Sequence, residues 1–79
     1  MTVFLDRRRW IVRPGCEDVR RAIAHELLEE RHHLHRRQAE RSAAADWTAR
    51  TVWDGFVAES RQIIRSLRLV ALSTRQYVP

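Results

Sequence analysis

The chain has 79 residues, 44% of them hydrophobic and 32% charged, and its formal net charge is +5. This length indicates a single domain spanning residues 1–79, and the composition is typical of a folded helical protein, which excludes a second domain and an intrinsically disordered chain. All the basic residues other than histidine are arginines. Their excess favours an acidic partner such as nucleic acid, an anionic membrane surface or an acidic protein.

The sequence contains no membrane-spanning pattern, because no apolar run approaches the roughly 20 residues that such a helix needs. The stretch from Met1 to Val12 carries charge and lacks the continuous apolar segment of a signal peptide. Cys16 is the single cysteine, so no internal disulfide can form. Together these features predict a cytoplasmic protein. We expect no membrane partner, because the apolar stripe of the second helix is needed for folding.

Residues 2–13 contain two β-prone runs, Val3–Leu5 and Trp10–Val12. A short N-terminal β-hairpin with its turn near Asp6 fits this pattern, although the turn lacks the favoured Asn-Gly or Gly-Gly sequence. The alternative is one extended arm that lies across the helices. In both cases we expect Phe4, Trp10 and Ile11 to help cover the second helix, because an isolated two-stranded hairpin is barely stable in water.

A first helix is predicted over residues 17–40. Pro14 and Gly15 end the preceding extended segment, and Glu17 and Asp18 then place negative charge in the first helical turn, where the helix dipole favours it. The apolar stripe of this helix is thin, and polar residues replace it in the C-terminal half. We therefore expect that half to be exposed or to pair with polar groups. The stripe consists of Val19, Ile23, Leu27 and Leu34.

Residues 42–46 form an ambiguous joint, since they contain neither glycine nor proline. In the first interpretation the chain turns here, Asp46 caps a second helix over residues 47–74, and the two helices form a hairpin. In the second, one helix continues through the joint and forms a rod that must oligomerise. We favour the hairpin, because the wide apolar stripe of the second helix needs a cover.

The second helix has an apolar side and a cationic side at about 100° per residue. Gly55 lies inside it and is interpreted as a point of close backbone approach, and the C-terminal residues from Tyr77 are expected to be frayed. The apolar side comprises Val52, Trp53, Phe56, Ser60, Ile63, Ile64, Leu67, Val70 and Ala71, and the opposite side carries Arg50, Asp54, Arg61, Arg65 and Arg68.

The predicted fold is therefore mainly α: two long antiparallel helices, with a short N-terminal β-hairpin or extended arm. Three apolar residues of the second helix, Trp47, Leu69 and Leu72, project away from the stripe. They suggest a protein interface, either with a partner protein or in a homodimer that forms a dimeric bundle.

Two groups of arginines are candidate binding residues. Arg61, Arg65 and Arg68, with Arg50 near the same line, are spaced to follow a phosphate backbone, whereas the simpler interpretation is a solvated helix face. A second basic run would project from the tip of the predicted hairpin, beside aromatic residues that can stack on bases. This run is Arg7, Arg8 and Arg9.

Signals for metal binding or catalysis are weak in this sequence. The four histidines lack the i, i+4 spacing of a helical metal site, and Cys16 has no histidine close in sequence. We predict no catalytic residues, metal or cofactor. The leading hypothesis is a non-enzymatic basic protein that binds nucleic acid or a nucleoprotein complex. The alternative is a protein–protein interaction module, such as a phage-encoded or mobile-element inhibitor of the anti-defence or antitoxin-like kind, whose arginines meet an acidic protein surface.

Overall fold

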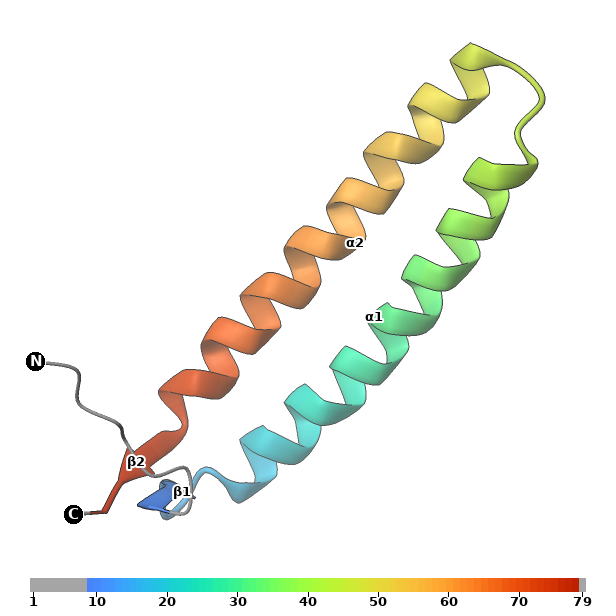
Figure 1. The fold of residues 1–79 in the computed structure, drawn as a ribbon. Helices are drawn as coiled ribbons and strands as arrows, with labels where there is room; N and C mark the ends of the chain where they lie inside the picture. Colours follow the sequence, from blue (N-terminus) through green and yellow to red (C-terminus); the bar gives the residue numbers. More distant parts are fainter. Residues whose placement is uncertain (1–8, 79) are drawn as a thin grey trace, which may run out of the picture.

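The computed structural model describes residues 9–78, which form a helical hairpin whose open end is closed by two short strands (Figure 1). The elements in chain order are β1 (Trp10–Val12), α1 (Glu17–Ala43), α2 (Trp47–Ser73) and β2 (Arg75–Tyr77). The helices are 27 residues each and pack antiparallel along their length. The predicted mainly α fold of two long antiparallel helices is thus confirmed.

The joint between the helices is a turn. Helix α1 ends at Ala43, and Ala44 adopts an extended conformation. Asp46 then caps α2, because its Oδ1 accepts a hydrogen bond from the backbone N–H of Ala49 at 2.8 Å. The hairpin interpretation of residues 42–46 is therefore correct, and the continuous rod is excluded.

Helix α1 begins directly after a tight turn over Arg13–Cys16. The N–H of Cys16 donates to the carbonyl of Arg13 at 3.0 Å, and Gly15 has a φ of 88°. Proline followed by a glycine of positive φ is the sequence of a type II turn. This turn sets the angle at which β1 leaves the helix.

Strand β1 pairs with β2, so the two ends of the described chain meet (Figure 1). Trp10 lies opposite Tyr77 with ring centroids 5.3 Å apart, and the N–H of Arg13 donates to Thr74. A strand at Trp10–Val12 was expected, but its pairing with the C-terminal strand was not. The proposed partner run Val3–Leu5 lies outside the described residues, and the expected fraying at Tyr77 is wrong.

The helices meet along a narrow seam. Its most buried apolar side chains are Ile23 of α1 and Val57 and Ile64 of α2, and Ser60 between them is fully buried. The seam follows a spacing of three and four residues that selects one line of each helix. The predicted stripe of α2 was broader than the surface that α1 covers. Val52, Phe56, Ile63 and Val70, which we expected inside, remain 37–54% exposed.

The molecule is a single layer of two helices. Its principal extents are 55 × 35 × 14 Å and its radius of gyration is 17.4 Å, against about 11 Å for a compact globule of this length. Both broad faces of this layer are consequently open. A Cβ added at Gly55 meets no atom within 4 Å, so the close approach expected there is absent from the described chain. Neither described helix is long and apolar enough to cross a membrane.

Candidate nucleic-acid interface

One broad face of the hairpin is lined by arginines from both helices. Arg61, Arg65 and Arg68 of α2 are exposed and border a hollow of about 350 Å³. Arg31 of α1 borders the same hollow, whose floor includes Leu34 and Ile64 of the seam. We call Arg31, Arg61, Arg65 and Arg68 the arginine face. The predicted trio therefore lies together, as its helical spacing required.

Arg31 was not among the residues predicted from the sequence. It is far from Arg61 in the chain, and only the antiparallel packing of the helices brings the two side chains to one hollow. The seam spacing contained a usable signal, because Arg31 follows Glu30, whose side chain is only 13% exposed, and Arg61 follows the fully buried Ser60. Assigning the heptad register of both helices would have placed them on the same face.

Arg50 lies apart from the other members of the predicted row. Its Nε donates to the carbonyl of Ala44 at 3.3 Å, which ties it to the turn between the helices. Asp54, on the same side of α2, forms an ion pair with Arg41 of α1. This neutral pair separates Arg50 from the arginine face.

The arginine face forms no ion pair within the described chain, although Arg61 also borders a neighbouring hollow with Asp54. The ion pairs among residues 9–78 join carboxylates to Arg21, Arg37, Arg41, His25 and His33, and none of them includes a member of the arginine face. Four guanidinium groups at one hollow without a carboxylate create a positive potential that attracts anions. Arginine suits phosphate in particular, since its planar fork donates two parallel hydrogen bonds.

The N-terminal basic run is only partly described. Arg7 and Arg8 lie outside the described residues, and their role in binding stays a prediction. Arg9 is exposed beside the paired strands, where its carbonyl accepts a hydrogen bond from the N–H of Val78 at 2.7 Å. It does not line the hollow of the arginine face.

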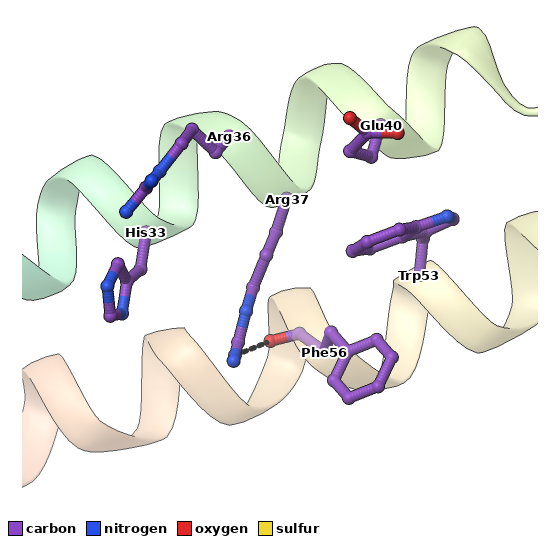
Figure 2. Close-up of a pocket in the computed structure, with 6 residues that line it drawn as sticks. All are labelled: His33, Arg36, Arg37, Glu40, Trp53 and Phe56. Atoms are coloured by element: carbon purple, nitrogen blue, oxygen red, sulfur yellow. Dashed lines mark hydrogen bonds between the residues drawn. The ribbon is translucent and has the colours of Figure 1, made fainter.

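The opposite broad face carries a second hollow of about 370 Å³, shown in Figure 2. Arg37 crosses from α1 to α2, where its Nη1 donates to the carbonyl of Phe56 at 2.8 Å and to Oγ of Ser60 at 2.9 Å. Its guanidinium also lies 5.3 Å from the centroid of the Phe56 ring and pairs with Glu59 at 3.7 Å. Trp53 packs beside Phe56, with ring centroids 5.4 Å apart. Arg37 is thus a structural residue of the hairpin.

The three predicted interface residues are all exposed. Trp47 is 78% exposed at the start of α2, and Leu69 and Leu72 are 62% and 55% exposed near its end. Leu69 borders a hollow of about 430 Å³ together with Arg61 and Arg65. Of these three residues, Leu69 therefore adjoins the arginine face on α2.

The histidines and Cys16 do not converge. His25 lies 3.8 Å from Glu29 and His33 lies 3.7 Å from Glu30, each pair within α1. Across the described part of the chain, no three side chains of histidine, cysteine, aspartate or glutamate are grouped so as to hold a metal ion. Cys16 is a partly buried free thiol.

Comparisons of the chain with protein families, with curated proteins and with solved structures give no match.

Proposed function

We propose that this protein is a small non-enzymatic binding protein that engages nucleic acid, alone or within a nucleoprotein complex, through the arginine face. The observation that carries the proposal is the convergence of Arg31 with Arg61, Arg65 and Arg68 on one hollow without an intramolecular carboxylate. Clustered like charges repel each other, and an anion bound between them removes this repulsion.

The dimensions of the face suit an extended polyanion. Arg61 to Arg68 covers about 10 Å of helix axis at 1.5 Å per residue, and Arg31 lies across the seam, where helix axes are about 8–10 Å apart. Backbone phosphates of a nucleic acid provide closely spaced charges on this scale. Phosphate contacts carry no sequence information, so we propose binding that is independent of sequence.

The test is the salt dependence of binding to a fluorescent oligonucleotide, measured by anisotropy with duplex and single-stranded probes. Four phosphate contacts give a slope of log affinity against log salt of about −3.6 for duplex and about −2.8 for single strands. Duplex affinity should then fall about 150-fold between about 50 and 200 mM salt. Replacing Arg61, Arg65 and Arg68 together by alanine should reduce the slope for duplex to about −0.9.

A matched control keeps the same net charge but removes arginines that do not line this hollow. It is the triple variant R13A/R21A/R75A, whose three residues are exposed. Its slope should stay within about one of that of the wild type. Absence of binding by the wild type at low salt, or equal losses in the two triple variants, refutes the proposal.

A second candidate is a protein–protein module. The exposure of Trp47, Leu69 and Leu72, and the position of Leu69 beside Arg61 and Arg65, favour it. A mixed apolar and cationic surface suits an acidic protein patch, where buried aromatic and arginine side chains contribute most of the affinity. Under this alternative, neither oligonucleotide binds at low salt, and W47A/L69A/L72A loses the protein partner.

A further inference from the structure

The face opposite the arginine face carries an uncovered apolar line. Phe56, Ile63 and Val70 repeat every seven residues on α2, Val52 extends the line toward the turn, and Val19 of α1 lies at the strand end. Each of these side chains is between 37% and 54% exposed. We call these five residues the apolar face.

The apolar face is additional to the line of apolar residues that α2 buries against α1. A helix that packs on a single neighbour needs one apolar line, and α2 already provides Val57, Ile64 and Leu67 at the seam. A helix with two adjacent apolar lines is typical of a bundle with more than two helices. The single-layer shape, 14 Å in its shortest extent, supplies no further helix from the described chain.

The charged residues beside the apolar face indicate which kind of partner can bind there. Arg36 and Glu40 border its hollow with Phe56, and Arg37 is paired with Glu59. This side therefore carries charges of both signs, with Glu26 one heptad after Val19 as a further carboxylate, whereas the arginine face has four cations without an ion pair in the described chain. A second copy therefore meets complementary charge at the apolar face and repulsion at the other face.

We propose that a second copy of this chain covers the apolar face and that the protein is a four-helix homodimer. The contact is isologous, with the same five residues contributed by each copy. Both arginine faces then point outward on opposite sides of the dimer. This surface differs from that of Trp47, Leu69 and Leu72.

The area available is sufficient for such a dimer. Val52 to Val70 covers about 27 Å of helix axis, and two helices of about 10 Å give a width of about 20 Å. The product is about 540 Å² for each copy, or about 1,100 Å² in total. Specific interfaces start at about 1,000 Å² of total buried area.

The test is the solution mass of the full chain, measured by light scattering coupled to size-exclusion chromatography over a concentration series without nucleic acid. We expect the wild type to have twice the mass of one chain at about 100 µM, and Ile63→Asp, which puts a charge at the centre of the contact, to have the mass of one chain. Leu69→Asp is the matched control, because Leu69 is on the same helix and more exposed. It should remain dimeric.

A wild type with the mass of one chain at about 100 µM overturns the proposal without any variant. Dissociation by Leu69→Asp but not by Ile63→Asp also overturns it, because the contact would then use the outer side of α2. Should circular dichroism show that Ile63→Asp is unfolded, Val70→Asp near the helix end replaces it, and a folded dimeric Val70→Asp counts against the proposal. Nucleic-acid binding is not measured here, so failure of the dimer and failure of the proposed function are distinguishable.

Discussion

Arg37 should be the most important polar side chain for the stability of the hairpin. Its Nη1 bridges the carbonyl of Phe56 and the hydroxyl of Ser60, and its side chain is only 25% exposed. Hydrogen bonds from a charged donor contribute about 1.5–3 kcal/mol when shielded, and the exposed pair with Glu59 adds less than about 1 kcal/mol. Replacing Arg37 by alanine also leaves the fully buried hydroxyl of Ser60 without this donor.

We therefore expect Arg37→Ala to lower the free energy of unfolding by about 2–3 kcal/mol, a large fraction of the stability of so small a protein. The melting temperature should fall by about 10–20 °C. The assay is thermal and urea unfolding followed by circular dichroism, at one fixed protein concentration, because a homodimer's stability depends on concentration.

Arg36 provides the matched control, since it is adjacent in sequence but exposed. Arg36→Ala should change stability by less than about 0.5 kcal/mol. The double variant R37M/S60A removes donor and acceptor together and should be more stable than the sum of the two single changes predicts, because neither partner of this hydrogen bond is then left unpaired. If Arg37→Ala is as stable as Arg36→Ala, the bridge contributes nothing and this reasoning is refuted.

Three further predictions concern the cap of α2, the interior of α2 and the turn before α1. Asp46→Ala removes the cap that accepts from Ala49 and should cost about 1 kcal/mol by urea unfolding, whereas Asp46→Ser should retain most of it. Gly55→Ala should raise stability by about 0.5–1 kcal/mol, because a Cβ there meets open space. Gly15→Ala should lower stability by about 1 kcal/mol, because its φ of 88° is unfavourable for alanine. If alanine changed stability equally at Gly55 and Gly15, the roles given to these two glycines would be contradicted.

The boundaries of the helices were predictable because their signals are local. Pro14 and Gly15 stop the chain before α1, and Asp46 caps α2 through a contact only three residues away. The predicted ranges 17–40 and 47–74 therefore agree closely with Glu17–Ala43 and Trp47–Ser73.

The remaining features depend on contacts between distant residues. The pairing of β1 with β2 and the place of Arg31 on the arginine face follow from the register of the two helices, which no local pattern of one helix contains. Contacts between distant residues also decide which apolar side chains of α2 are buried. Periodicity identified the apolar side of α2, but only the width of its single neighbour determines that Ile64 is covered and Ile63 is not.

The pairing of the terminal strands has a consequence for the order of folding. Joining Val12 to Arg75 in a random chain closes a loop of about 60 residues, whereas the turn before Asp46 closes only a few. We therefore expect contact between the helices to start at the turn and to extend toward the ends of the chain. We expect the strands to pair last in folding and to separate first in unfolding, so that the first opened state keeps the helical hairpin.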